Sequence, residues 1–308
     1  MSNKRVAILS ATGIGDALLM MIAAHQLAEA GDEVTLFHDG HPLISPLFNT
    51  KVTFDIYPTK AFSPYCQFDL VILENDNSKR AYQFFDIRQQ FKESYVLFHK
   101  PSNMQKEGDF LFDQNIPVAE NIRRSLLKFL PNPTLENGIR PLEKITKKPK
   151  QIAIHPSSND KKRNWSISKF IALAKSLQRQ GYDPIFTLSK SEAKLFPEIS
   201  DSGCKLLTFN NLLSLATFYA ESSYFIGNDS GPGHIASNVK VPTLTLSGNP
   251  KHVAKWRPGF TRGKVVTVPF LLPNFKGMNF SLRDEHWQRF ISTNRALRCF
   301  NELKRESL

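Results

Sequence analysis

The sequence lacks long hydrophobic runs, and this excludes a membrane-spanning helix. No apolar stretch in its 308 residues reaches the roughly 18 to 20 residues that such a helix requires. The longest run, Ala17–Ala24, follows a glycine-rich turn and predicts a buried helix. The apolar stretch before Gly13 is too short for a secretory signal peptide, so we expect a cytoplasmic protein.

Cysteine is also scarce, with Cys66, Cys204 and Cys299 far apart in the chain. They form no CxxC pair and no cluster with histidines. A disulfide framework and a structural zinc site are therefore excluded, and three reduced thiols are expected.

Acidic side chains are too few to balance the basic ones, since 28 acidic and 40 basic residues give a net charge of +12. An excess of this size favours polyanions. The basic residues are spread along the chain without a recognition helix, zinc finger or RRM pattern, so we expect no nucleic-acid partner. An anionic membrane surface, a phosphate-rich substrate and simple solubility all remain compatible with the charge.

Short apolar runs alternate with helical patterns throughout, which predicts an α/β protein with parallel sheets and right-handed βαβ crossovers. In the first half the expected strands are Arg5–Ser10, Glu33–His38, Val52–Tyr57, Phe68–Leu73 and Ser94–Phe98, and the expected helices are Asp16–Ala30, Ser78–Gln90 and Val118–Leu130. In the second half the expected strands are Gln151–His155, Pro184–Leu188, Cys204–Leu207, Ser223–Gly227 and Thr243–Ser247, and the expected helices are Ser166–Gln180, Glu192–Ile199, Asn211–Ala220 and Pro232–Asn238.

Pro131–Pro149 is the best linker, because it combines four prolines with a lysine cluster and shows little periodicity. We therefore expect an N-terminal domain over residues 1–145 and a C-terminal domain over residues 146–282. The final segment, 283–308, predicts an amphipathic helix over Arg283–Arg305. This helix caps its own domain, crosses back to pack on the N-terminal domain, or rests on a membrane surface.

The first turn with chemical potential is Ser10–Asp16, which joins the first predicted strand to the first helix. Gly13 and Gly15 let a ligand approach backbone N–H groups that are unpaired at a helix start. Asp16 either takes a proton from a hydroxyl nucleophile or caps the helix. The dinucleotide fingerprint GxGxxG is incomplete, because Leu18 occupies its third glycine position, and a dehydrogenase is therefore disfavoured.

A second turn between a strand and a helix is dense in glycine, serine, aspartate and histidine. Pro232 suits the first helical turn, so the neighbouring amides form a natural seat for a diphosphate. Asp229 would repel a phosphate and is better suited to sugar or ribose hydroxyls. His234 either donates to a phosphate oxygen or packs in the core. The candidate donor-binding residues of this turn are Asp229, Ser230, Gly231, Pro232, Gly233 and His234.

A third turn, His155–Trp165, leaves the first strand of the second half and places hydroxyls beside cations. It is either a solvated basic loop or a phosphate-binding loop, in which lysine acts as a mobile charge and arginine as a fork. The phosphate-binding interpretation is favoured because the topology places this loop on the same sheet edge as the second turn. Its candidate donor-binding residues are Ser157, Ser158, Lys162 and Arg163.

Together the three turns resemble the family 9 glycosyltransferases, the heptosyltransferases of lipopolysaccharide core synthesis. The family signature Asp-(Thr/Ser)-Gly-x-x-His-x-Ala is matched in full by Asp229–Ala236, and the family's His-Pro-Gly-Ser…Lys-x-Trp loop corresponds to His155–Trp165. The N-terminal Arg-x-Gly-Asp turn is matched by Gly15 and Asp16, with Gly13 in place of the arginine. The resemblance implies the GT-B fold, in which two Rossmann-like domains face each other across a cleft, with the acceptor in the first and the donor in the second.

The resemblance further implies a role for each candidate. Asp16 would be the general base, Lys162 or Arg163 would hold the donor diphosphate, and Asp229 and His234 would bind the donor sugar and phosphate. The reaction would invert the anomeric centre without a metal or other cofactor, because cations and helix dipoles stabilise the departing nucleoside diphosphate. The donor would be a nucleotide sugar such as ADP-heptose. The acceptor would be a lipopolysaccharide or other lipid-linked glycan, met at the inner face of the cytoplasmic membrane.

Two other hypotheses keep the same fold. A nucleotide-sugar epimerase or hydrolase would act on the donor alone, whereas a catalytically silent protein would bind a nucleotide sugar without turnover. A transferase differs from both in requiring an acceptor for reaction.

Overall fold

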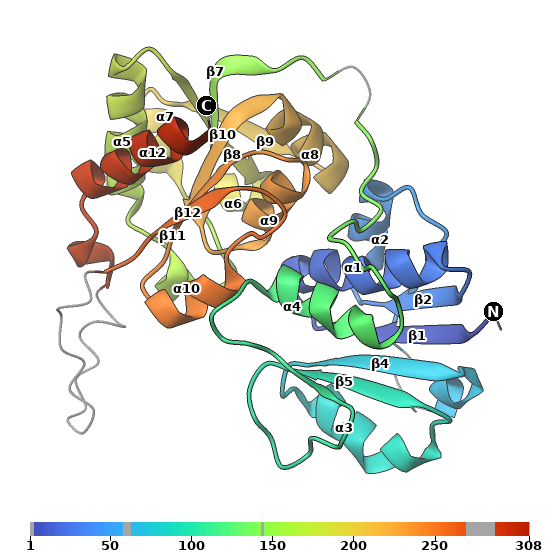
Figure 1. Cartoon of the computed structure of the whole chain (residues 1–308). Coiled ribbons are helices and arrows are strands. Elements are labelled where there is room, and N and C mark those ends of the chain that lie inside the picture. The colour runs from blue at the N-terminus through green and yellow to red at the C-terminus, as the bar shows by residue number, and fades with distance from the viewer. Residues whose placement is uncertain (1–2, 58–62, 143–144, 269–286, 308) are drawn as a thin grey trace, which may run out of the picture. The chain divides into compact units, whose positions relative to one another are not determined.

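The computed structural model describes residues 3–57, 63–142, 145–268 and 287–307. The chain divides into two compact units, Met1–Pro141 and Leu142–Leu308. Each unit is built on one parallel sheet with helices packed on both faces (Figure 1). The division falls after Pro141, close to residue 145, where the sequence placed the domain boundary.

In the first unit the described strands pair in the order β3-β2-β1-β4-β5-β6. Their bounds are β1 Arg5–Leu9, β2 Glu33–Phe37, β3 Thr53–Asp55, β4 Leu70–Asn75, β5 Ser94–Phe98 and β6 Phe110–Leu111. The helices are α1 Ile14–Glu29, α2 His41–Ile44, α3 Lys79–Ile87 and α4 Val118–Ser125, with 3-10 turns η1 Ser45–Leu47, η2 Ser63–Gln67, η3 Arg88–Gln90 and η4 Leu126–Lys128.

The second unit repeats this arrangement in the order β12-β11-β10-β7-β8-β9. Its strands are β7 Lys148–His155, β8 Asp183–Ser189, β9 Lys205–Phe209, β10 Ser222–Asn228, β11 Thr243–Leu246 and β12 Gly263–Val266. Its helices are η5 Lys161–Arg163, α5 Ile167–Arg179, α6 Lys190–Ala193, α7 Pro197–Asp201, α8 Leu212–Glu221, α9 Gly231–Asn238, α10 Pro250–Trp256 and α12 Thr293–Ser307.

Both units therefore have the doubly wound strand order of nucleotide-binding folds. In this order the chain reverses direction across the sheet between its first and fourth strands, which are β1 and β4 in one unit and β7 and β10 in the other. Loops that leave these strands diverge to opposite faces, and a crevice opens at their carboxyl ends. The three turns predicted from the sequence follow β1, β7 and β10, so each lies at such a switch point.

The central strands are buried because side chains cover both faces of each sheet. Residues 6–9 and 70–73 are at most 2% exposed, as are residues 152–154. This burial explains why these strands read as continuous apolar runs rather than alternating patterns. In the second unit Trp165, Phe170 and Phe186 share one core with Trp287 and Phe300.

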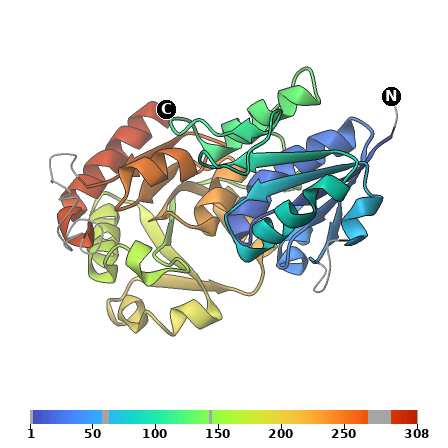
Figure 2. The same ribbon diagram turned by 90° about the horizontal axis from the view of Figure 1, so that it is seen from below.

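The C-terminal helix corrects the sequence prediction in two respects. The expected single helix over Arg283–Arg305 is interrupted after residues 287–290, and α12 begins at Thr293; residues 283–286 of that prediction lie outside the described part. Crossing back to pack on the N-terminal domain was one of the three alternatives for this helix. Instead α12 packs beside α5 and against β11 and β12 of its own unit (Figures 1 and 2). That packing buries the apolar stripe of α12, which consists of Ala296, Phe300 and Leu303.

Among the described residues, no helix has the length and apolar character needed to cross a bilayer.

Candidate functional site

The candidate site of the second unit forms where two neighbouring strands end. Strands β7 and β10 pair in parallel, with Gly227 opposite His155. The loop after β7 and the turn after β10 consequently emerge side by side. Asn228, the last residue of β10, joins them: its Oδ1 accepts from Trp165 N–H at 2.9 Å and its Nδ2 donates to Pro156 O at 2.6 Å.

Asp229 is the buried carboxylate of this site, with 4% of the residue exposed. Arg163 donates through Nη2 to Asp229 Oδ2 at 2.8 Å and to the Asp229 carbonyl at 2.7 Å. The ring nitrogen Nε2 of His252, on α10, lies 3.3 Å from the same carboxylate oxygen. The structure thus brings the two predicted donor-binding turns into direct contact through an ion pair.

The surroundings of Asp229 keep it ionised. Burial alone raises the pKa of this carboxyl group, but the hydrogen bond from His252 and the charge of Arg163 act in the opposite direction and prevail. The pKa of Asp229 is therefore lower than that of an ordinary aspartate. A fully charged acceptor is well suited to bind hydroxyl groups, each such hydrogen bond contributing about 1.5 to 3 kcal/mol.

The loop His155–Trp165, called the phosphate loop below, carries its cations on the short helix η5. Asp160 caps this turn, accepting from Lys162 N–H at 2.9 Å, and the side chains of Lys161 and Lys162 are exposed. Ser158 donates to Asn164 Oδ1 at 2.7 Å, whereas Ser157 is buried beneath the loop. Ser158 and Ser157 therefore shape the loop, and its charges remain available to an anion.

Helix α9 begins beside Asp229. Ser230 is its N-cap residue, and Pro232 occupies its first turn, as the sequence predicted. Such a helix start presents unpaired amides and a positive dipole end. In α9, however, Pro232 has no N–H and the Gly233 N–H already donates to the Ser230 carbonyl at 3.0 Å, so what this helix start offers an anion is chiefly its dipole.

His234 lies one turn into α9 and is 5% exposed. Burial lowers the pKa of its imidazole, although the nearby Asp229 acts to raise it. Within the described residues its Nδ1 atom has no hydrogen-bond partner. The buried, unpartnered nitrogen of this neutral imidazole leaves both alternatives from the sequence standing, a hydrogen bond to a ligand and a residue of the core.

Buried histidines predict how the stability depends on pH. Burial lowers the pKa of His38, His155 and His234, so the unfolded chain binds more protons than the folded one as pH falls below about 6.5. The free energy of unfolding should therefore be fully retained above that pH and decline as the pH falls below it. Urea unfolding at a series of pH values measures this, and a stability that rises as the pH falls contradicts it.

Two residues of the site escaped the sequence prediction. Glu192 follows β8, and its carboxylate lies 3.7 Å from His155 Nε2 and caps Ser189 N–H at 2.8 Å. His252 lies in α10, whose Asn249 N-cap and Pro250 repeat the cap-and-proline pattern of α9. That repeated signature marks another helix start at the carboxyl edge of this sheet and could have revealed His252.

In the first unit Asp16 stands in the first turn of α1, where its Oδ2 accepts from Gly13 N–H at 3.1 Å. The capping alternative from the sequence is thus observed, and the residue is partly exposed. A Cβ atom at Gly13 would lie 2.6 Å from this oxygen. Glycine in place of the family arginine therefore allows Asp16 to fold back on its own turn.

Buried polar groups of neighbouring segments hydrogen-bond to the start of the Ser10–Asp16 turn. Glu74, at the end of β4, is 1% exposed and accepts from Ala11 N–H at 3.0 Å. The His99 ring lies 3.2 Å from the other oxygen of Glu74, and Tyr57 donates to the Ser10 carbonyl. These contacts fix the path by which the chain leaves β1 and reaches Gly15 and Asp16.

Two doubly wound units with polar turns at their switch points define a protein of the GT-B fold class. Solved structures agree. The glycosyl transferase family 9 protein of Veillonella parvula is similar over 99% of each chain, with a TM-score of 0.72 and 16% identity. The E. coli heptosyltransferase WaaC with ADP is similar over 97% of this chain and 99% of its own, with a TM-score of 0.68 and 14% identity. At these identities the likeness concerns the fold.

The comparisons of sequence are more specific. Residues 123–271 match the model of glycosyltransferase family 9 (heptosyltransferase). The E. coli lipopolysaccharide heptosyltransferase 3 is 26% identical over 215 residues, and the match spans 62% of this chain and 61% of that relative's length. These findings confirm the resemblance to family 9 glycosyltransferases. The family model includes both turns of the second unit, whereas Gly13, Gly15 and Asp16 lie outside it.

Proposed function

We propose that this protein is an inverting, metal-independent glycosyltransferase. It would move a sugar, heptose or a similar one, from a nucleoside diphosphate donor such as ADP-heptose to a hydroxyl of a lipopolysaccharide or other glycan acceptor. The observation that carries this proposal is the contact between Arg163 and Asp229, at 2.8 Å. It places a cation suited to binding phosphate beside a carboxylate suited to binding hydroxyl groups, at the switch point of the second unit.

Different groups of the second unit would bind the diphosphate and the sugar of the donor. The exposed charges of Lys162 and Arg163 and the dipole at the start of α9 would hold the diphosphate. Asp229 would accept hydrogen bonds from sugar hydroxyls, and His234, whose buried Nδ1 has no hydrogen-bond partner among the described residues, would bind the same ligand. Negative charge on the diphosphate would grow as the bond to the sugar breaks, so these contacts would be stronger in the transition state than in the bound donor, and that difference accelerates the reaction.

The chemical step would be one displacement. The acceptor oxygen bonds to the anomeric carbon as the bond from that carbon to the phosphate oxygen breaks. The hydroxyl proton passes to the Asp16 carboxylate, and the electron pair of the broken bond remains on the nucleoside diphosphate. Inversion follows because a single attack from the opposite face replaces the leaving group.

Metal independence is supported by the cationic loop, since Lys161, Lys162 and Arg163 supply the positive charge that a divalent ion supplies in other phosphate sites. Activity in excess EDTA equal to that with magnesium is expected, and a loss that magnesium restores would refute this part of the proposal.

The competing hypotheses are separated by donor chemistry. Calorimetry with ADP, UDP and GDP identifies the nucleotide that the second unit binds, and chromatography then follows the matching nucleotide sugar with and without acceptor. Turnover without acceptor favours an epimerase or hydrolase, and binding without turnover favours a silent protein. The linkage in the product, assigned by NMR against that of the donor, tests inversion.

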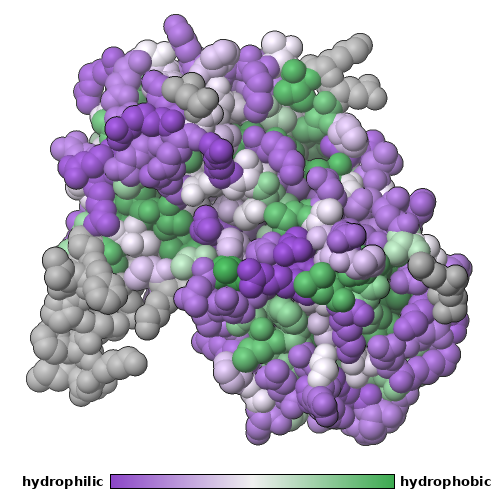
Figure 3. All heavy atoms as spheres, in the orientation of Figure 1, coloured by the Kyte–Doolittle hydropathy of each residue, from purple (hydrophilic) through white to green (hydrophobic). Residues whose placement is uncertain are grey.

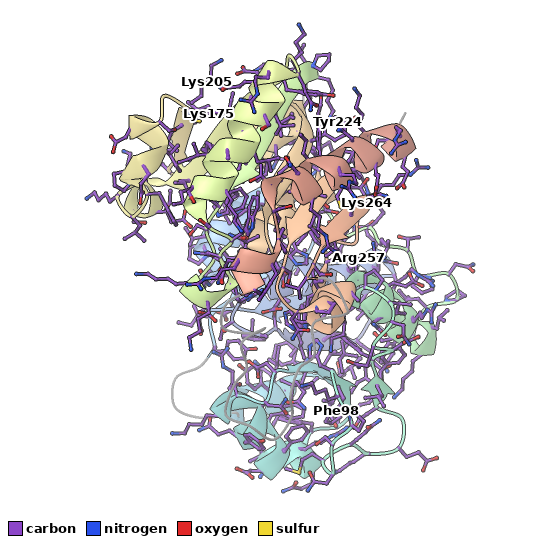
Figure 4. All side chains as sticks on the ribbon, turned by 90° about the vertical axis from the view of Figure 1, so that its left-hand side faces the viewer. Phe98, Lys175, Lys205, Tyr224, Arg257 and Lys264 are labelled. Carbon is purple, nitrogen blue, oxygen red and sulfur yellow. The ribbon has the colours of Figure 1, made fainter. Side chains whose placement is uncertain are left out.

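Peripheral contact with an anionic membrane also belongs to the proposal. Helix α5 has no acidic residue, and both acids of α12, Glu302 and Glu306, are bound by Lys264. The surface over α12 is hydrophilic (Figure 3), and Lys175 projects from α5 while Lys264 lies beside α12 (Figure 4). Co-sedimentation with anionic but not with neutral vesicles is expected, and equal recovery with both would contradict electrostatic docking.

His252 supplies a further test of the donor site. Replacement by alanine removes one of the two groups on Asp229, and we expect the dissociation constant for the nucleotide sugar to rise about fivefold, as for one lost hydrogen bond. Glutamine can still donate from a similar position, so His252→Gln should recover most of the affinity. Equal losses in the two variants would assign the effect to packing on Trp256, which the His252 ring stacks against at 5.8 Å.

A further inference from the structure

The phosphate loop of the second unit is held from a distant part of the chain. Trp287 donates through Nε1 to the Lys162 carbonyl at 2.8 Å. Gln288 donates to the same carbonyl at 3.2 Å. The carbonyl that receives both bonds belongs to the middle residue of η5, between the two other cations of the loop.

The contact is reciprocal, because the loop and the helix after it also hold the C-terminal segment. Trp165 donates through Nε1 to the Ile291 carbonyl at 3.1 Å. Lys169, on α5, donates to the carbonyls of Arg289 and Ile291 at 3.2 and 2.9 Å. Its ammonium group thus satisfies the last carbonyls of the short helical stretch 287–290. Ordering one segment therefore orders the other.

Trp287 is fixed by shape as well as by hydrogen bonding. The side chain is 3% exposed and belongs to the core of the second unit. Its ring lies over Gly248, after β11, so closely that a Cβ atom there would come within 2.6 Å of Trp287 Cδ1. Only glycine leaves this space, and the indole is thereby held with its N–H directed at the loop.

We propose that Trp287 is a positioning residue that sets the phosphate loop for its anionic ligand through the Lys162 carbonyl. The inference rests on the proposed function, in which that ligand is the diphosphate of the donor. The indole hydrogen bonds of Trp165 and Trp287, which we call the clamp, join the loop to the C-terminal segment. Lys162 and Arg163 then reach the anion from a backbone that is already ordered, which lowers the entropic cost of binding.

Two substitutions disturb the clamp by different routes. Trp287→Phe removes the N–H donor and keeps an aromatic ring in the core, whereas Gly248→Ala displaces the ring while leaving its N–H intact. Tyr182→Phe is the matched control, because Tyr182 packs on Phe300 of α12 at 5.5 Å, outside the loop. Melting temperatures identify any variant that has simply lost stability.

Two measurements distinguish the inference from the proposed function. Hydrogen exchange over residues 157–165 reports the order of the loop, and calorimetry with ADP reports its use. We expect faster exchange and an ADP dissociation constant about three to ten times higher in Trp287→Phe and Gly248→Ala, with Tyr182→Phe like the native protein. The affinity loss should vanish when Lys162 and Arg163 are both alanine, because the two cations that the contact positions are then absent.

Unchanged exchange and unchanged ADP affinity in both clamp variants would overturn the inference. An undiminished affinity loss in the background without the two cations would overturn it as well, since the effect would then be general. Faster exchange together with no ADP binding by the native protein would leave the clamp standing and would count against the proposed donor site instead.

Discussion

Replacing Asp16 with asparagine should lower kcat for sugar transfer by about 10²- to 10⁴-fold, the usual contribution of a general base. Asparagine has the size of aspartate but cannot take the acceptor proton. Because Asp16 belongs to the first unit and the donor would be bound by the second, the dissociation constant of the nucleotide sugar should stay within about twofold. Steady-state kinetics combined with calorimetry measure both quantities.

The control for this variant is Glu29→Gln at the other end of the same helix. Glu29 forms an exposed pair with Lys51 at 3.6 Å, a contact of little energetic consequence. Its kcat should equal that of the native protein. A native kcat in Asp16→Asn would leave Asp16 as the helix cap that its bond to Gly13 N–H makes it, and another base would have to be sought.

Replacing Asp229 with asparagine should weaken binding of the nucleotide sugar by about 10- to 100-fold, the range for hydrogen bonds to a charged group. The variant loses the charge that Arg163 and His252 surround. Both partners are about two-fifths exposed and can turn to water, so the fold should tolerate the change better than a fully buried pair would. Calorimetry and a melting curve separate affinity from stability.

Asp183→Asn is the matched control, since Asp183 opens β8 at the amino edge of the same sheet and pairs with exposed Lys205 at 2.7 Å. Its donor affinity should be native. The lowered pKa of Asp229 adds a pH criterion. The stabilisation from this carboxylate is present above the ordinary aspartate pKa of about 3.9 and is lost only as pH falls through its lower folded value. Donor binding that fails near pH 6 because Asp229 protonates would contradict the account.

The strands at the centre of each sheet were predictable because burial on both faces leaves an unmistakable apolar run. Strand β5 has the predicted bounds, Ser94–Phe98, and β1 and β2 each end one residue before the predicted end. The edge strands β6 and β12 were missed. An edge strand is paired on one side only, and β6, with two residues, is too short for any periodicity to be visible.

Prolines account for two other errors. The sequence assigned residues up to Pro149 to the linker, yet β7 already begins at Lys148. Its register shifts between Ser222 and Tyr224 of β10, and a bulged strand end accommodates a proline that lacks an N–H donor. The expected helix Glu192–Ile199 is split into α6 and α7, because Pro197 opens a new helix instead of continuing the first.

The candidate site was predictable as far as its residues follow one another in the chain. Asp229 and the glycines of its turn form a dense local motif, and the topology placed the Lys162 loop next to it. His252 and Trp287 act across 23 and 125 residues of sequence, on Asp229 and on the Lys162 carbonyl. Such contacts leave no local pattern, since they depend on how α10 and the C-terminal segment return to the sheet.

The most direct test of the account is acceptor-dependent transfer. The protein is incubated with ADP-heptose and a lipopolysaccharide that lacks heptose, in the presence of EDTA, and mass spectrometry and chromatography follow the glycan and ADP. The account predicts that the glycan gains one heptose for each ADP released and that release without acceptor is negligible. Release of ADP at the same rate with and without acceptor, and an unchanged glycan, would contradict it.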